Sequence, residues 1–189
     1  MTNDFEETFS ITCLLEVGHF WSSSETLKPL ISLSMKGFVD AKELSVEQWG
    51  EILSYIKNEY PNELPCLFGG YKISSKEWEF HPQCCSTLEN LQSWLDILRP
   101  DKFEEYQYLE QGHPSPKIQK FKNHIEIHLM DEDLGEPFEN CKSVSVNLSR
   151  VIFQSKIEKV KEFIDTTITS LQKAGVKGLT LSEIKDSFY

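Results

Sequence analysis

The sequence contains none of the short motifs that mark the common nucleotide-dependent and zinc-dependent enzymes. It has no G-x-G-x-x-G dinucleotide fingerprint, no G-x-x-x-x-G-K phosphate loop and no H-E-x-x-H zinc motif. Neither Gly69-Gly70 nor the turn from Gly112 to Pro116 resembles a phosphate-binding loop. The sequence therefore favours a function without catalysis, and we expect no enzyme activity, no cofactor and no bound metal.

Long apolar runs are also missing. No stretch approaches the ~20 apolar residues that a membrane-spanning helix needs. The first segment, MTNDFEETF, lacks the basic and apolar regions of a secretory signal. Five cysteines at irregular spacing do not form a disulfide framework, so we expect reduced thiols and a cytoplasmic location. They are Cys13, Cys66, Cys84, Cys85 and Cys141.

Negative charge, in contrast, is abundant and unevenly distributed. Residues 1–140 carry 25 Asp and Glu against 11 Lys and Arg, whereas residues 141–189 carry 5 against 8. The whole chain has a formal net charge of −11. A surface of this sign repels nucleic acid and anionic membranes and attracts basic proteins. Aromatic residues make up 12% of the chain, which is typical of a folded protein and not of a disordered acidic tail.

The spacing of apolar residues predicts an α+β fold, with a mostly antiparallel sheet and two or three helices in a single domain over residues 1–189. Strands are expected over residues 9–17, 29–38, 123–130 and 143–148, with short extended pieces at 66–68 and 77–81. Helices are expected over residues 46–60, between 82 and 100, over about 149–173, and near 182.

Helix boundaries have their own signals. Ser86 and Glu89 have the spacing of a capping box, as do Ser45 and Gln48, and Gly175 is placed to end the long helix. The apolar face of the helix over 46–60 is expected to comprise Val46, Trp49, Ile52, Leu53, Ile56 and Tyr60.

The corner His81-Pro82-Gln83-Cys84-Cys85 is the first candidate for chemistry. Its histidine and thiols could bind zinc, but structural zinc sites use two paired ligand sets and no second set follows. Alternatively, Cys84 or Cys85 could act as the nucleophile of a hydrolase, with His113 or His128 as its base. Small buried thiols at a strand-to-helix corner are the more common arrangement.

The strand over 123–130 is the second candidate. His124, Glu126 and His128 share one of its faces and could ligate a metal ion, whereas the wet side of a one-sided antiparallel sheet has the same pattern. Paired carboxylates at Glu104-Glu105 could in principle act in acid–base catalysis, although a solvated charge run looks the same.

A surface that binds a basic protein is the prediction that agrees best with the charge. Acidic residues are densest just after the 123–130 strand, and aromatic residues flank them. Aromatic side chains favour interface centres, and complementary charge speeds encounter. The expected contact residues are Asp131, Glu132, Asp133, Glu136, Glu139, Tyr106, Tyr108 and Phe138.

Three segments carry a resemblance to a known class of proteins: FHPQCCSTLENLQSW, then GHPSP, then a strand ending in DED. Together they resemble small bacterial immunity-type proteins that neutralise polymorphic or contact-dependent growth inhibition toxins, over residues 77–135. The matching positions are Pro82, Gln83, Cys84, Cys85 and Trp94. The resemblance implies a cytosolic inhibitor that binds one cognate toxin domain. A cysteine- or metal-dependent hydrolase and an adaptor domain are the alternatives.

Overall fold

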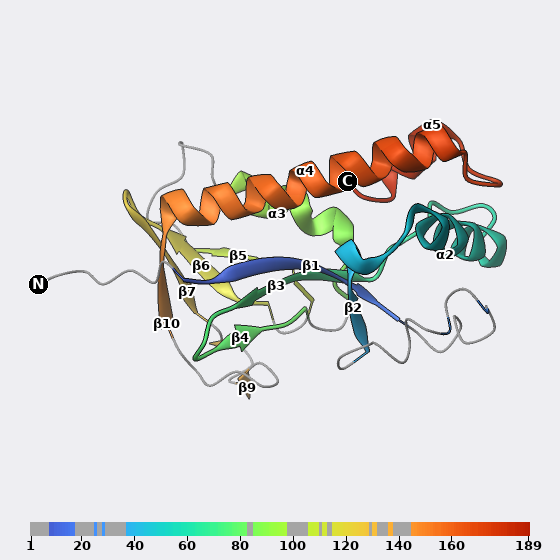
Figure 1. The fold of residues 1–189 in the computed structure, drawn as a ribbon. Coiled ribbons are helices and arrows are strands. Elements are labelled where there is room, and N and C mark those ends of the chain that lie inside the picture. The colour runs from blue at the N-terminus through green and yellow to red at the C-terminus, as the bar shows by residue number, and fades with distance from the viewer. Residues whose placement is uncertain are drawn as a thin grey trace, which may run out of the picture.

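The computed structural model describes residues 8–17, 25, 28, 37–82, 85–97, 106–109, 111–112, 115–128, 130–131, 136–137 and 145–189. Within these residues the chain forms two four-stranded antiparallel sheets, a two-stranded ribbon and four α-helices (Figure 1). The predicted α+β fold is confirmed. The strands divide into two main sheets where one was expected. The described residues form four α-helices, one in each predicted helical segment, where two or three were expected to pack on the sheet.

The first sheet has the strand order β2-β1-β3-β4. Its strands are β1 (Ser10–Glu16), β2 (Phe38–Asp40), β3 (Gly69–Ser74) and β4 (Glu79–Phe80). Most of the strand predicted over 29–38 lies outside the described residues. The central strand β3 was not predicted, because its first two residues are glycines. Gly69 has φ +150°, and a Cβ there would lie 2.2 Å from the carbonyl oxygen of Leu14, so only glycine fits against β1.

The second sheet has the order β10-β7-β6-β5. Its strands are β5 (Tyr106–Tyr108), β6 (Lys117–Lys120), β7 (His124–His128) and β10 (Ser145–Ser149). Residues alternate between its faces, as predicted for 123–130 and 143–148. The buried face carries Ile118, Ile125, Ile127, Val146 and Leu148. The remaining strands, β8 (Met130–Asp131) and β9 (Glu136–Pro137), form a separate ribbon.

Helix α2 (Val46–Glu59) begins and ends close to the predicted residues. The Ser45–Gln48 capping box is confirmed: Gln48 N donates to Ser45 Oγ at 3.2 Å, and Ser45 N donates to Gln48 Oε1 at 2.9 Å. Helix α4 (Arg150–Ala174) also matches its prediction and is followed by Gly175, with φ +75°. Local sequence signals therefore position both long helices.

The other predicted capping box, Ser86–Glu89, is wrong. Ser86 is buried, and the residue that precedes the 3-10 helix η3 (Leu88–Asn90) is Thr87. Helix α3 (Leu91–Asp96) follows η3 and is only six residues long. Helix α5 (Leu181–Asp186) begins close to the predicted residue 182, and a capping box joins Thr180 to Glu183. A short 3-10 helix, η2 (Ala41–Glu43), precedes α2.

Helix α4 unites the two main sheets. It contacts β1 of the first sheet and β7 and β10 of the second, and it also contacts α2, α3 and α5. It runs along one side of both sheets (Figure 1). Trp94 of α3 stacks on Phe153 of α4, with centroids 6.0 Å apart, and meets Tyr71 of β3 edge-on at 5.4 Å. One continuous cluster of buried apolar residues results.

No helix among the described residues has the length and apolarity needed to cross a membrane.

Candidate partner-binding site

The acidic segment that the sequence singles out contains the ribbon β8–β9. Asp131 and Glu136 are Cα partners in its antiparallel register, as are Met130 and Pro137. The backbone therefore places two predicted contact residues directly opposite each other. The remaining predicted contact residues of this segment lie outside the described residues; they are Glu132, Asp133, Phe138 and Glu139.

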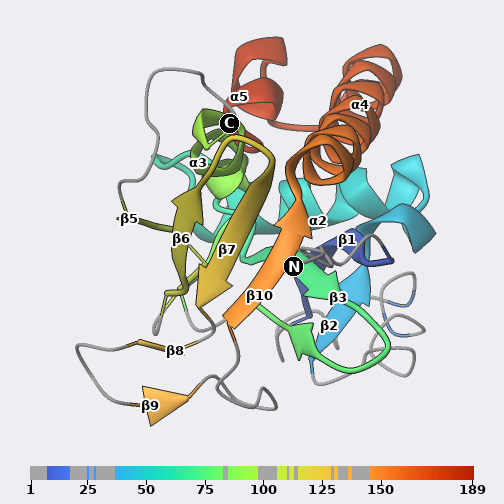
Figure 2. The same cartoon turned by 90° about the vertical axis from the view of Figure 1, so that its left-hand side faces the viewer.

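Tyr108 lies at the same end of the second sheet as this ribbon. It is the Cα partner of Lys117 in β6, which is in turn the partner of His128 in β7. The ribbon begins at Met130, two residues beyond His128. Figure 2 shows β8 and β9 beyond this end of the sheet, on the side away from α4. Three predicted contact residues, Tyr108, Asp131 and Glu136, are thus brought to one end of the molecule's second sheet.

Tyr108 in β5 has an exposed ring beside a lysine. Tyr108 is 48% exposed, and the Lys117 ammonium lies 5.5 Å from the centroid of its ring. This cation–π contact places a positive charge beside the ring. Tyr106 lies two residues earlier in β5, opposite Gln119. The structure describes only its backbone.

The polar face of β7 does not bring His124 and His128 together. Four residues at a rise of about 3.4 Å each separate their Cα atoms by roughly 14 Å. The His124 ring stacks on Phe121, which lies in the turn before β7, with centroids 4.4 Å apart. His128 Nε2 lies 3.8 Å from Glu126 Oε1. A zinc ion needs its ligand atoms about 2 Å away, and among the described residues no three His, Cys, Asp or Glu side chains meet that requirement.

The described part of the cysteine corner corrects one expectation, because buried thiols are the more common arrangement there and Cys85 is exposed. Cys85 has φ +66° and forms no disulfide bond with a described residue. His81 is buried, and its Nε2 lies 3.1 Å from Glu79 Oε1. Beside them a Cβ on Gly70 would lie 2.7 Å from Ser86 Oγ, so β3 packs closely against this corner. Cys84, Gln83 and His113 lie outside the described residues, and a nucleophilic role stays a prediction.

The structure adds a surface that the sequence did not suggest, between the end of β1, the last turns of α2 and the segment 61–68. It is a hollow of about 260 Å³, which we call the apolar groove. Buried Leu15 and Leu67 lie at its base. Three large side chains at its edge are exposed: Tyr60 at 58%, Leu64 at 51% and Phe68 at 46%. Its full lining is Leu15, Glu16, Tyr55, Ile56, Glu59, Tyr60, Glu63, Leu64, Cys66, Leu67 and Phe68.

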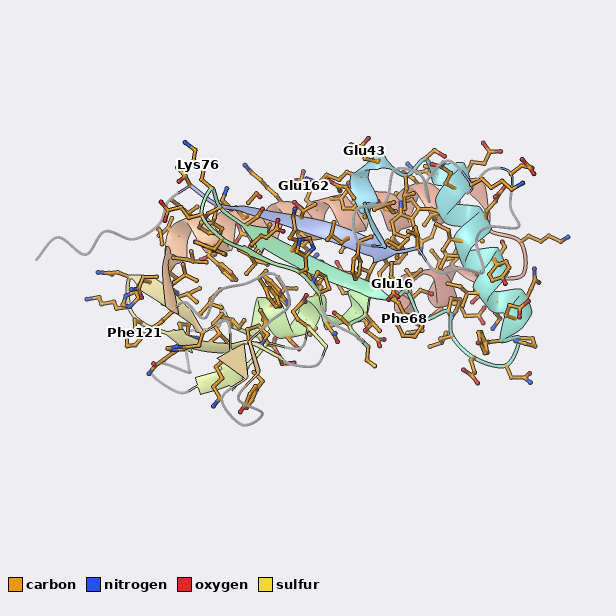
Figure 3. The ribbon with its side chains drawn as sticks, turned by 90° about the horizontal axis from the view of Figure 1, so that it is seen from below. Glu16, Glu43, Phe68, Lys76, Phe121 and Glu162 are labelled. Carbon is orange, nitrogen blue, oxygen red and sulfur yellow. The ribbon has the colours of Figure 1, made fainter. Side chains whose placement is uncertain are left out.

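The charged side chains that line the apolar groove are all acidic. Glu16, Glu59 and Glu63 are exposed at its edge, and its lining contains no Lys or Arg. Figure 3 shows Glu16 and Phe68 side by side near α2. Burial and the nearby Glu89 carboxylate raise the pKa of the Cys66 thiol in the lining. An apolar surface edged with carboxylates is suited to hold an apolar side chain flanked by cations.

One sequence signal near this groove led to a wrong prediction, which placed Tyr60 on the apolar face of its helix. The helical spacing that places Trp49, Ile52 and Leu53 in the core also places Tyr60 on that face. In the structure α2 ends at Glu59, and Tyr60 is exposed. The exposure of Leu64 and Phe68 depends on the path of the chain after Pro61, which local spacing does not encode.

Comparison with protein-family models, with curated proteins and with solved structures finds no match to this chain. The resemblance to immunity-type proteins over residues 77–135 therefore stays a prediction.

Proposed function

We propose that this protein acts by binding, as an immunity-type inhibitor of a cognate bacterial toxin that has a basic surface. The observation that carries the proposal is the placement of the acidic ribbon β8–β9 at the end of the second sheet that also presents Tyr108. Carboxylates attract a basic partner over distance, and an exposed aromatic ring such as that of Tyr108 offers apolar area for close contact.

A nuclease is the toxin class that the charge favours. Nucleases hold phosphates with cationic side chains, because nucleic acid binding rests largely on phosphate contacts. Carboxylates of an inhibitor can occupy the positions that phosphates would take. The chain's net charge of −11 would at the same time keep it from binding nucleic acid itself. A toxin with other chemistry but a basic surface would satisfy the same requirement.

The test compares two variants with the same change in net charge. The first neutralises the acidic segment: Asp131→Asn, Glu132→Gln, Asp133→Asn and Glu136→Gln. The control neutralises four exposed carboxylates elsewhere: Glu43→Gln, Glu77→Gln, Glu158→Gln and Glu162→Gln. The binding partner is the toxin domain. We expect it to be encoded directly upstream of the gene for this chain.

We expect the first variant to associate with the toxin domain about 10-fold or more slowly at low salt, with a smaller change at high salt. The association rate of the control variant should fall much less, because its substituted residues lie outside the proposed contact. Stopped-flow association rates and calorimetry measure both effects. Equal losses in the two variants, or a partner without a basic surface, would overturn the proposal.

A further inference from the structure

We propose that the apolar groove is a second binding surface, and that it takes a cationic segment of a partner protein with one or two large apolar side chains between Lys or Arg residues. The groove lies at the end of β1 in the first sheet. The acidic ribbon follows the second sheet (Figure 2). The inference does not depend on the proposed function, because any partner with such a segment would fit.

Large exposed hydrophobic side chains cluster at the groove. Exposed large hydrophobic side chains are common singly, but several around one hollow mark an interaction surface. Tyr60, Leu64 and Phe68 all line the groove. The other exposed hydrophobic side chains among the described residues lie singly on α2, β5, α4 and α5; they are Val46, Tyr108, Val151 and Leu181.

The carboxylates at the edge of the groove determine which kind of segment it can bind. Three carboxylates edge the groove, and the neighbouring cation is already engaged: Lys57 Nζ donates to the Glu63 carbonyl at 3.0 Å and to Glu183 Oε1 at 2.8 Å. An uncharged apolar segment would leave the edge carboxylates without a counter-charge, and an acidic one would be repelled. Lys or Arg beside the apolar anchor complements the edge.

A second hollow, between α2 and the end of α4, is lined by side chains of both charges. It has a volume of about 730 Å³ and is lined by Glu47 and Glu51 but also by Lys177. The Lys177 carbonyl accepts a hydrogen bond from Ser54 Oγ at 3.2 Å within this lining. Its mixed charge does not select one kind of occupant, so the inference concerns the groove alone.

The groove is held open by main-chain hydrogen bonds on both sides of its base. Glu16 N donates to the Phe68 carbonyl at 2.9 Å, which ties the segment to β1. On the other side, Leu88 N donates to the Leu67 carbonyl at 3.0 Å. A preformed surface loses little conformational entropy when it binds, so even a short segment can be held.

The test uses three labelled 12-residue peptides and fluorescence anisotropy. The first has two leucines four residues apart, with Lys and Arg at most other positions. In the second the leucines are replaced by serine, and in the third the cations are replaced by glutamine. We expect the first to bind at least ~10-fold more tightly than either companion, because only it satisfies both halves of the groove.

Variants of the groove locate the binding. The change Leu64→Ser with Phe68→Ser should weaken the first peptide at least ~10-fold, and Glu59→Gln with Glu63→Gln should weaken it several-fold and reduce its salt dependence. Val151→Ser and Glu162→Gln change exposed side chains on α4 and should leave binding unchanged. The variant with the neutralised acidic segment should still bind the peptide, which separates this inference from the proposed function.

A footprint on the unmodified chain checks the location without any substitution. Cys66 lines the groove, whereas Cys85 is exposed elsewhere. The first peptide should slow alkylation of Cys66 severalfold and leave that of Cys85 unchanged, as followed by mass spectrometry. Three results would overturn the inference: equal binding of the serine peptide, no protection of Cys66, or a dimer in light scattering that Leu64→Ser converts to a monomer. The last would identify a second copy as the occupant.

Discussion

The apolar groove and the acidic end of the second sheet both carry negative charge, but they differ in what surrounds it. At the groove, carboxylates edge a hollow with buried Leu15 and Leu67 at its base. At the acidic end, Asp131 and Glu136 oppose each other in a two-stranded ribbon. Apolar anchors that exclude water control how slowly a complex dissociates, whereas exposed charge controls how fast it forms. On the two proposals, the groove would retain a partner and the ribbon would speed its capture.

This division requires one rigid body beneath both surfaces, and Trp94 tests it. Trp94 is fully buried between Tyr71 of the first sheet and Phe153 of α4. Trp94→Ala should lower the free energy of unfolding by about 3–5 kcal/mol, because a large cavity replaces the indole. Urea unfolding is monitored with two probes, circular dichroism and the alkylation of Cys66. The unfolding midpoints from the two probes should shift by the same amount. Val151→Ala, at an exposed site, should change stability by less than ~0.5 kcal/mol.

Separate transitions for the two probes would show that the groove unfolds independently of the rest. The continuous core of buried residues argues against that outcome, because α4 contacts strands of both main sheets.

The part of the structure that the sequence predicted is the part that local spacing controls. Helix α2 has its capping box at Ser45 and its buried positions three or four residues apart. Helix α4 ends one residue before Gly175, and β7 alternates buried Ile125 and Ile127 with polar neighbours. In each case the periodicity and the terminal residue agree, so the element follows from one short segment.

The part that the sequence did not predict depends on contacts between distant segments. Strand β3 begins with two glycines because Gly69 passes close to the Leu14 carbonyl, a contact across 55 residues that no local pattern contains. The groove arises for the same reason, since its lining comes from β1, α2 and the segment before β3. Charge was predictable from composition, whereas its placement beside exposed apolar side chains was not.

Gly69 offers a way to perturb the groove and leave the acidic end intact. Gly69→Ala would bring a methyl group to 2.2 Å from the Leu14 carbonyl oxygen, next to Phe68. We expect a loss of about 1–3 kcal/mol from this overlap, in addition to the strain of a positive φ. Gly37→Ala has a positive φ too, at +83°, but no atom lies within 4 Å, so it should show the strain alone, about 1–2 kcal/mol.

Chemical denaturation of the two alanine variants measures their difference. If the groove and the ribbon act separately, Gly69→Ala should also weaken binding of the first peptide, which carries the leucines and the cations (the leucine peptide). It should leave the ribbon-dependent association rate unchanged. A smaller loss for Gly69→Ala than for Gly37→Ala would contradict the close approach of β3 to β1.

The smallest expected effect concerns the link from the groove to α5. Hydrogen bonds from Lys57 and from Thr180 lower the pKa of Glu183 to about 2. A carboxyl with a lowered folded-state pKa stabilises the fold above its unfolded value of about 4.3, and this contribution is lost as the pH falls toward 2. Thermal melting between pH 6 and pH 2 should therefore show a decline that Glu183→Gln reduces.

Asp186→Asn is the matched control, because Asp186 lies on the same helix and accepts from Ser182 instead of a lysine. It should leave the acid-induced decline nearly as steep as in the unmodified chain. Since Lys57 also donates to the Glu63 carbonyl at the groove, Glu183→Gln should weaken the leucine peptide slightly at neutral pH and leave the ribbon's association rate unchanged. Equal effects on both surfaces would mean that α5 supports the whole fold and not the groove in particular.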